Sequence, residues 1–292
     1  MNQDDIIRIL NKHVFDNERA AVVQAVASNP DRFVGVFRST TPRLKLLQNI
    51  LQSREVRFGD ALEEVIRKLI ADMGFVHLPN EIRSGEKQKL ACDQYFCSSD
   101  QTQYFVVEQK VRDDHDSSKR DGQITNFRKK LEYLRAQHGT ALTGILYFID
   151  PALNKNRKFY EERLAQLRQM LGVRLMLQYG SEFFAYMQGH TCTWSLLFST
   201  LESWRRGVPE DINLNLDSEP EKTLDRLQNV SVNTWKKLAA HDGLWESGVI
   251  QVIFPIGATL RMLVDRLNSA RQAQKQRVAQ MLRKRIEAFY RT

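Results

Sequence analysis

The chain has 292 residues, of which 42% are hydrophobic and 27% are charged, a composition typical of a folded globular protein. Its 43 basic residues exceed its 35 acidic ones, and the net charge of +8 favours a polyanionic partner such as nucleic acid. The three cysteines show no CxxC spacing, which argues against a zinc site and predicts reduced thiols. No P-loop, dinucleotide Gly-rich fingerprint or HExxH motif is present, so no nucleotide cofactor is expected.

Two segments bear on the cellular location of the protein. The N-terminal sequence MNQDDIIRIL carries early acids and no long apolar run, unlike a secretory signal. The most apolar later stretch, 248–260, is too short to span a bilayer and includes Gln251 and Pro255. We therefore expect a cytoplasmic protein without a membrane partner.

The pattern of the chain predicts an α/β fold with a mixed central sheet flanked by helices and with helical additions at both ends. The first part reads as short helices broken by turns at Asn29-Pro30 and Thr41-Pro42. The predicted regions are a helical N-terminal region at 1–57, a catalytic core at 58–206, a polar linker at 207–220 and a helical C-terminal region at 221–292.

Within the predicted core, helical and strand patterns alternate along the chain. Apolar residues recur on one helical stripe in the first segment, and a polar connector between two β-rich runs predicts a hairpin. The expected elements are a helix at 59–73, hairpin strands at 89–96 and 103–111, a helix at about 120–137, a strand at 141–149, a helix at about 157–171, a strand at 173–179 and a helix from 181.

The hairpin brings three charged residues together. If its turn is centred at Asp100 and Gln101, residues whose numbers sum to about 201 lie opposite each other, so Asp93 faces Glu108. Directly opposed residues share a face with Cβ atoms roughly 5 Å apart. Lys110 lies two residues beyond Glu108 and therefore points to the same side.

This combination of side chains is typical of a site for a hard divalent cation. Two carboxylates at such a distance repel each other unless a cation lies between them. Bound Mg²⁺ can hold a phosphate and lower the pKa of an attacking water, and an ammonium group can orient that water. The alternative is a solvated sheet face with surface ion pairs, which contribute little to stability.

Asp93, followed after fourteen residues by Glu108-Gln109-Lys110, resembles the motif of the PD-(D/E)XK nucleases. The segments 108–119 and 179–184 resemble those of type II restriction endonucleases, and the resemblance covers roughly 58–190. Cys92 stands where the motif has proline. The resemblance implies a restriction-endonuclease-like fold, a Mg²⁺ cofactor, and a catalytic set of Asp93, Glu108, Lys110 and Glu63, with Asp93, Glu108, Gln109 and Glu63 as metal ligands.

The helix before the hairpin carries two adjacent acids that could supply the additional carboxylate. With Leu62 as the zero of helical phase, the apolar stripe centres near ~10° at about 100° per residue. Glu63 then flanks the stripe, whereas Glu64 faces away from it. Glu63 is the better candidate, although an acid near a helix start can also serve only the helix dipole.

The segment after Lys110 is dense in charge and has no apolar residue from 112 to 123, which predicts a surface loop. In the functional interpretation its basic residues contact DNA phosphates and a glutamine on the next helix lies near the catalytic centre; in the other, the charges pair in solvent. His115 is expected to be a polar loop residue. The candidate DNA-binding residues are Arg112, Lys119, Arg120 and Gln123.

A basic helical segment ends the chain. From 259 to 292 nine lysines and arginines accompany two acids, a pattern that favours contact with phosphates. Apolar residues recur at helical spacing along it, from Leu260 to Phe289, and must pack on the core or on a second subunit. A packed helix with a solvated basic face is the alternative to DNA binding.

The leading hypothesis is a type II site-specific deoxyribonuclease that hydrolyses both strands of double-stranded DNA by Mg²⁺-activated water. Such enzymes usually act as homodimers whose two-fold symmetry matches a palindromic site. Two alternatives remain open: a structure-selective repair or recombination nuclease on the same fold, and a non-catalytic DNA-binding protein. The recognition sequence and the cleavage position do not follow from the sequence, because base contacts depend on a few side chains placed by tertiary structure.

Overall fold

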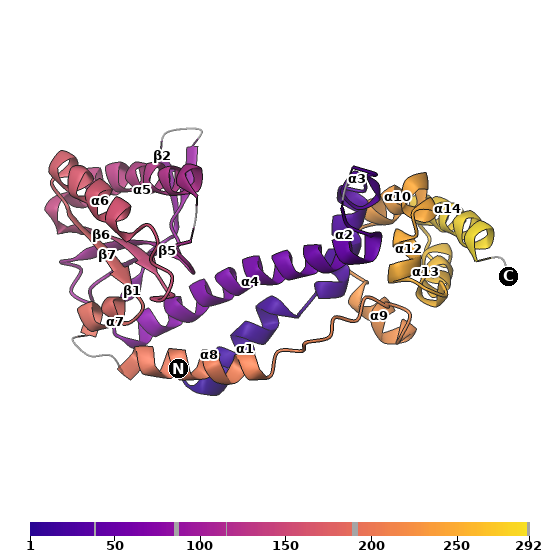
Figure 1. Ribbon diagram of the computed structural model, residues 1–292, viewed down its shortest axis with the longest axis horizontal. Helices are drawn as coiled ribbons and strands as arrows, with labels where there is room; N and C mark the ends of the chain where they lie inside the picture. The colour runs from indigo at the N-terminus through magenta and orange to yellow at the C-terminus, as the bar shows by residue number, and fades with distance from the viewer. Residues whose placement is uncertain (38, 85–87, 115, 189–191, 291–292) are drawn as a thin grey trace. The chain divides into compact units, whose positions relative to one another are not determined.

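The computed structural model describes residues 1–37, 39–84, 88–114, 116–188 and 192–290, and these form two compact units (Figure 1). Unit 1 contains residues 1–13 and 57–208, and unit 2 contains residues 14–56 and 209–292. The predicted N-terminal region thus divides between the two units. Among the residues described, no helix combines the length and the apolar character needed to cross a membrane.

Unit 1 is built on a five-stranded mixed sheet, which confirms the predicted fold class. The first two pairs of neighbouring strands are antiparallel, and the other two pairs are parallel. The central parallel strand is buried along its whole length, because helices cover it on both faces. The strand order is β1 (Val76–His77), β4 (Gln94–Cys97), β5 (Tyr104–Lys110), β6 (Leu142–Phe148) and β7 (Arg174–Tyr179).

Helices cover both faces of this sheet, and each face has its own hydrophobic core. The side chains of β5 alternate, so that Phe105 and Val107 enter one core and Val106 enters the other. The first face carries α1 (Gln3–Val14), the end of α4 (Pro42–Asp72), α7 (Ser181–Gln188) and α8 (Cys192–Arg206), and the second carries α5 (Ser117–His138) and α6 (Arg157–Leu171).

A glycine in β6 lets α5 approach the sheet closely. A Cβ atom added to Gly144 would lie 2.5 Å from Leu131 Cδ2 and 2.7 Å from Leu175 Cδ2, distances that real Cβ atoms essentially never show. Phe127, on α5, would be 3.2 Å away. The side chains of α5 therefore pack directly on the backbone of the strand at this point, and a larger residue would force Leu131 or Leu175 to shift.

The predicted register of the hairpin is confirmed. The pairs Gln94↔Val107 and Cys97↔Tyr104 both have numbers that sum to 201, and Asp93 directly precedes the paired residues, at the position that this register places opposite Glu108. The turn is fixed by the carboxylate of Asp100, which accepts hydrogen bonds from Ser98 Oγ at 2.6 Å and from the Thr102 backbone N–H at 3.2 Å.

The predicted strand at 89–96 is wrong in one respect, because it is broken in two. β3 (Gln88–Ala91) leaves the main sheet and pairs with β2 (Glu81–Ser84) in a separate two-stranded sheet, and β4 begins only at Gln94. At the break, the Cys92 N–H donates to the carbonyl of Asn80. Arg67 and Asn80 side chains both donate to the Asp93 carbonyl. These contacts satisfy backbone groups that a continuous strand would have paired within one sheet.

Unit 2 is helical around a single core. The predicted C-terminal basic helix is two helices, and its apolar residues, from Leu260 to Ile286, are buried in that core with Trp235 and Phe254. Of the two packing possibilities left open by the sequence, the core is the one found. The helices are α2 (Glu18–Ser28), α3 (Asp31–Val34), α9 (Pro220–Arg226), α10 (Val232–Ala240), α11 (Asp242–Glu246), α12 (Val249–Ile253), α13 (Ala258–Asn268) and α14 (Ala273–Phe289), together with the start of α4.

The segment predicted as a linker, 207–220, contributes to this core. Leu214 and Leu216 are buried in it, and Asp217 is only 6% exposed. The Asp217 carboxylate accepts backbone hydrogen bonds from Gly257 at 2.7 Å and from Thr259 at 2.8 Å. Since these N–H groups lie at the start of α13, Asp217 satisfies donors that the helix itself leaves unpaired.

Candidate active site

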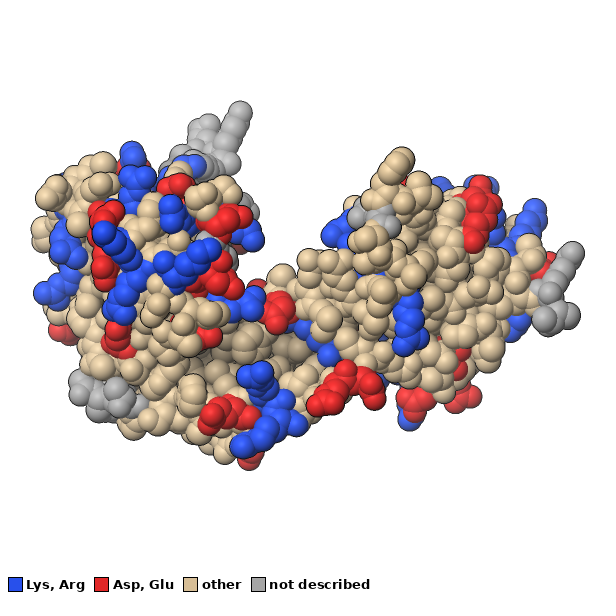
Figure 2. All heavy atoms as spheres, in the orientation of Figure 1, with Lys and Arg blue, Asp and Glu red and all other residues tan. Residues whose placement is uncertain are grey.

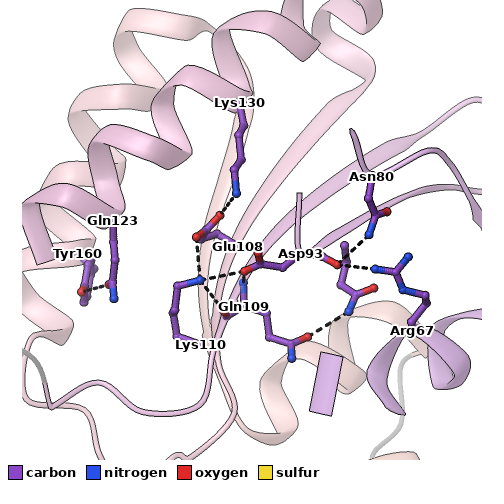
Figure 3. A network of polar contacts seen from close by, with 10 residues as sticks. Arg67, Asn80, Asp93, Glu108, Gln109, Lys110, Gln123, Lys130 and Tyr160 are labelled. Atoms are coloured by element: carbon purple, nitrogen blue, oxygen red, sulfur yellow. Dashed lines mark hydrogen bonds and ion pairs between the residues drawn. The ribbon is translucent and has the colours of Figure 1, made fainter. Parts of the chain in front are cut away.

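The three residues singled out on the hairpin lie together in the structure (Figure 3). Lys110 Nζ lies 2.9 Å from Asp93 Oδ2 and 2.8 Å from Glu108 Oε1. The same ammonium donates to the Gln109 carbonyl at 2.8 Å. One cationic group is therefore held where two carboxylate oxygens and one backbone oxygen converge.

The local backbone explains how Asp93 reaches this position. Asp93 lies directly before β4, at the point where β3 has left the sheet. Its carboxylate accepts the Gln109 N–H at 2.8 Å and so replaces a strand partner for β5. Glu108 and Lys110 share a face of β5 because side chains alternate along a strand.

A second lysine, which the sequence pattern did not predict, completes the group. Lys130 extends from α5 and its Nζ lies 2.5 Å from Glu108 Oε2 (Figure 3). Glu108 is 5% exposed and Lys130 is 7% exposed, so this ion pair is buried. A signal was present in the sequence, since Lys130 lies at helical spacing from Phe127 and Leu134 on the apolar face of its helix.

The electrostatic environment keeps these groups ionised. Burial acts to raise the pKa of Glu108, but Lys110 and Lys130 together outweigh it and hold the pKa below the usual value. Burial acts to lower the pKa of Lys110, and Glu108 and Asp93 reverse this effect and raise it. The site therefore contains mutually neutralising charges at neutral pH.

Of the two adjacent acids on α4, Glu63 is the one whose pKa is shifted by the charges of Asp93 and Lys110. Burial, and then the negative charge of Asp93, raise the pKa of Glu63 to about 7, and Lys110 partly opposes them. The Glu63 carbonyl also accepts a hydrogen bond from Gln94 Nε2 at 2.9 Å. Glu64 instead pairs with His13 at 2.7 Å and with Lys68 at 3.1 Å, away from the hairpin.

The donor atoms fit a magnesium ion that keeps part of its water shell. Within the described parts of the chain, no group of three or more His, Cys, Asp or Glu side chains is arranged to hold a metal ion. Mg²⁺ is, however, usually bound by only one or two carboxylates plus water and phosphate oxygens. Asp93 Oδ2, Glu108 Oε1 and the Gln109 carbonyl already converge on one cation, the Lys110 ammonium. The Gln109 side chain accepts from Gln94 at 3.3 Å, so its backbone oxygen is the one directed to the site.

The four candidate DNA-binding residues have different surroundings. Arg112 is 46% exposed and lies 4.0 Å from Asp114, and Lys119 is exposed in the first turn of α5. Arg120 donates to Asn156 Oδ1 at 3.0 Å and covers the ring of Phe159. Gln123 accepts from Tyr160 at 2.6 Å, and Figure 3 shows this pair apart from the carboxylate–lysine group. His115 lies outside the described residues.

The expectation that 112–123 is entirely a surface segment is wrong for Asp113, which is 0% exposed. Its carboxylate accepts hydrogen bonds from Asn156 N at 2.9 Å, Asn156 Nδ2 at 2.8 Å and Tyr179 Oη at 2.9 Å. These contacts tie the chain after β5 to the segments after β6 and at the end of β7. The absence of apolar residues could not reveal this, because a buried acid needs only enough donors around it.

Charged side chains of both signs are intermixed on the face of unit 1 shown in Figure 2, around α5 and α6. Several of the basic groups are paired locally. Arg157, for example, lies 3.1 Å from Glu182 and 3.2 Å from Glu161. This face of unit 1 is therefore a mixed surface and not a uniformly positive one.

Comparison with known proteins agrees with this geometry. Residues 76–205 match the family model of the type II restriction endonuclease HinfI, a segment that includes the hairpin and α5 to α8. No curated protein matches the chain. The family match confirms the resemblance to type II restriction endonucleases of the PD-(D/E)XK type.

Proposed function

We propose that this chain, whose residues 76–205 carry the HinfI-type restriction endonuclease match, is a Mg²⁺-dependent type II deoxyribonuclease that hydrolyses both strands of duplex DNA at a specific sequence. The observation that carries the proposal is the position of Lys110 Nζ, within 2.9 Å of Asp93 and within 2.8 Å of Glu108 and of the Gln109 carbonyl. The arrangement places oxygen ligands for a cation beside an ammonium group at one end of the hairpin.

Asp93, Glu108 and the Gln109 carbonyl would hold the magnesium ion, and Glu63 would add a further carboxylate. When bound, the ion supplies neutralisation of phosphate charge and a lowered pKa for the attacking water. The Gln109 N–H holds the Asp93 carboxylate in place at 2.8 Å. Lys130 holds Glu108 Oε2 and leaves Oε1 directed to the site.

In this proposal Lys110 contributes to the reaction through its positive charge. Its ammonium orients the attacking water and stabilises negative charge as the phosphodiester is cleaved. The raised pKa of Lys110 keeps it protonated, so it acts by charge and hydrogen bonding and not as a base. Its small residual exposure, 28% of the side chain, leaves it accessible to substrate.

The substrate in this proposal is double-stranded DNA, bound by a homodimer in the cytoplasm. Two copies related by a two-fold axis would present one catalytic group to each strand of a palindromic site. Arg112 and Lys119, whose side chains are exposed, would contact phosphates near the cleaved bond. Arg120 and Gln123 would support this contact by fixing α5 against α6 through Asn156 and Tyr160.

The test is a digest of a DNA of known sequence with Mg²⁺, followed by mapping of the fragment ends. We expect discrete fragments from the wild type, none with EDTA, and none from Lys110→Ala, while Lys110→Ala still binds the same DNA. Lys129→Ala, which removes an exposed lysine of α5, should cleave as the wild type does. Cleavage by Lys110→Ala at the wild-type rate would refute the site assignment.

Two other results would favour the alternative functions. Cleavage restricted to branched or damaged DNA, without a discrete ladder from plasmid, would indicate a structure-selective nuclease. Retained DNA binding without nicking at any Mg²⁺ concentration would indicate a non-catalytic DNA-binding protein.

A further inference from the structure

The basic residues near the end of the chain fall into two groups. Those of the first group are engaged within unit 2: Arg261 donates to the Ile256 carbonyl, Arg266 pairs with Asp225 at 3.2 Å, and Arg285 donates to the Ala239 carbonyl at 2.9 Å. Those of the second group have no ion pair or hydrogen bond from their side chains to any residue that the structure describes. This second group comprises Arg271, Lys275, Arg277, Arg283 and Lys284.

The unpaired cations belong to a stretch without any acid. Between Asp265 and Glu287 the sequence contains no aspartate or glutamate, but it contains seven lysines and arginines and four glutamines. α14 as a whole carries five cations and one acid, Glu287, which forms no ion pair with them among the described residues, so the helix keeps a net positive charge. Exposed charge of a single sign, without partners of its own, favours a ligand of the opposite sign.

Three of the exposed side chains lie along one line of α14. At about 100° per residue, Arg277, Gln280 and Lys284 fall within ~60° of one another. All three are exposed, whereas Val278, Leu282 and Ile286 on the opposite side are buried. The exposed line extends about 10 Å along the helix at 1.5 Å per residue.

The helix that carries this line is firmly held. α13 and α14 are joined by only four residues, 269–272, and both contribute to the single core of unit 2. Arg285 connects the C-terminal part of α14 to α10 and α11 through Ala239 and Asp242. The exposed side chains are thus displayed on a rigid support, as required for reading a sequence.

We propose that the exposed face of α14, with Arg277, Gln280 and Lys284, docks in the major groove of duplex DNA and helps to select the target sequence. The inference rests on the proposed function, because it assigns a specificity element to the same substrate. The major groove admits an α-helix, arginine and lysine pair with guanine, and glutamine pairs with adenine. A phosphate backbone on either side complements the unpaired positive charge of the helix.

The experiment measures DNA binding by the full chain with calcium in place of magnesium. The probes are a duplex that contains the sequence mapped from the digest and a duplex in which that sequence is shuffled. Arg277→Ala should lower affinity for the mapped duplex by about 5- to 150-fold, and affinity for the shuffled duplex by less. Gln280→Ala should relax discrimination at one base position, and Lys284→Ala should reduce the salt dependence of binding by about one phosphate contact.

Lys222→Ala is the matched control, because it removes one exposed cation of unit 2 that is already paired with Glu219. It should leave both affinities unchanged. If the wild type cleaves at discrete sites but the three α14 variants bind and discriminate as it does, the inference about α14 fails and the proposed function stands. A wild type that does not bind duplex DNA would overturn both. Conversion of a dimer to monomers by the three substitutions together, with discrimination unchanged, would overturn the inference in favour of a subunit interface.

Discussion

The charges of the candidate active site and the charges of α14 are arranged in opposite ways. In unit 1, Glu108 is buried between Lys110 and Lys130, with oxygen–nitrogen distances of 2.8 and 2.5 Å. On α14, Arg277 and Lys284 are exposed and have no partner among the described residues. The two lysines of unit 1 are paired with carboxylates and organise a site, whereas the two cations of α14 remain available to a ligand.

This difference predicts how each region responds to substitution. A buried charge that loses its partner is left without either solvent or a counter-ion, which costs several kcal/mol. An exposed charge that is removed leaves nothing unsatisfied, and surface substitutions usually change stability by less than about 0.5 kcal/mol. Stability should therefore depend on the charges of unit 1, and DNA affinity on those of α14.

The largest loss of stability is expected for Asp113→Ala. The substitution leaves the Asn156 and Tyr179 donors of a fully buried carboxylate without an acceptor, and hydrogen bonds to charged groups contribute about 1.5 to 3 kcal/mol each. We expect a loss of about 5 kcal/mol in the free energy of unfolding, near the lower limit for three such bonds, measured by chemical denaturation. The neighbouring exposed Asp114→Ala is the control and should be nearly neutral; equal effects of the two would contradict the burial of Asp113.

A somewhat smaller loss is expected for Lys130→Met, because Lys110 still compensates Glu108. The free energy of unfolding should fall by about 3 kcal/mol, and Lys130→Arg should recover part of it. Lys129→Met, one residue away and exposed, should be neutral. Calorimetric titration with Mg²⁺ in the absence of DNA should show a changed affinity for Lys130→Met alone, because the substitution removes a positive charge beside Glu108 and releases its Oε2. Binding unchanged from the wild type would mean that Lys130 does not position Glu108.

Glu63→Gln should have a smaller effect, and one of the opposite sign. The pKa of Glu63 is about 7 in the folded protein and about 4.5 ordinarily, so the folded state binds the proton more tightly. Stability relative to the unfolded chain therefore falls as pH rises from 4.5 to 7 and is constant above that range. Glutamine does not ionise, so the substitution removes this pH-dependent loss of stability. In EDTA, Glu63→Gln should be neutral near pH 4 and more stable by about 1 to 2 kcal/mol at pH 8, after allowance for solvent screening. A pH-independent difference would contradict the raised pKa.

The smallest effect on stability is expected for Lys284→Ala, which should lie within about 0.5 kcal/mol of the wild type. Its DNA affinity should nevertheless change, with the slope of log affinity against log salt reduced by about 0.9. Thermal unfolding and binding at several salt concentrations measure the two quantities on one sample. A substantial loss of stability would show that Lys284 has a structural partner.

The hairpin could be predicted from the sequence because its information is local. Alternation in β5 and a short polar turn fix the register, and the register alone brings Asp93 opposite Glu108. The break before β4 was not predictable in this way. It depends on Arg67 and Asn80, which are distant in sequence and donate to the Asp93 carbonyl.

The features that the sequence pattern did not predict depend on contacts between different helices, strands and loops. Lys130 reaches Glu108 only because α5 packs closely on β6, and periodicity does not report the distance between a helix and a sheet. Asp113 is buried because Asn156 and Tyr179 surround it from two other segments. In both cases the sequence shows a polar residue in an unexpected place, but it does not show which residue pairs with it.

The contact of α5 with Gly144 connects the apolar core to the candidate active site. A Cβ atom on Gly144 would lie 2.5 Å from Leu131 Cδ2, so Leu131 would have to shift, and any accompanying shift of α5 would be away from the sheet that carries Glu108. Because Lys130 is attached to that helix, such a shift would lengthen its ion pair without altering any charged residue. The position of Lys130 beside Glu108 thus depends on an uncharged residue inside the apolar core, the glycine that sets the spacing between α5 and the sheet.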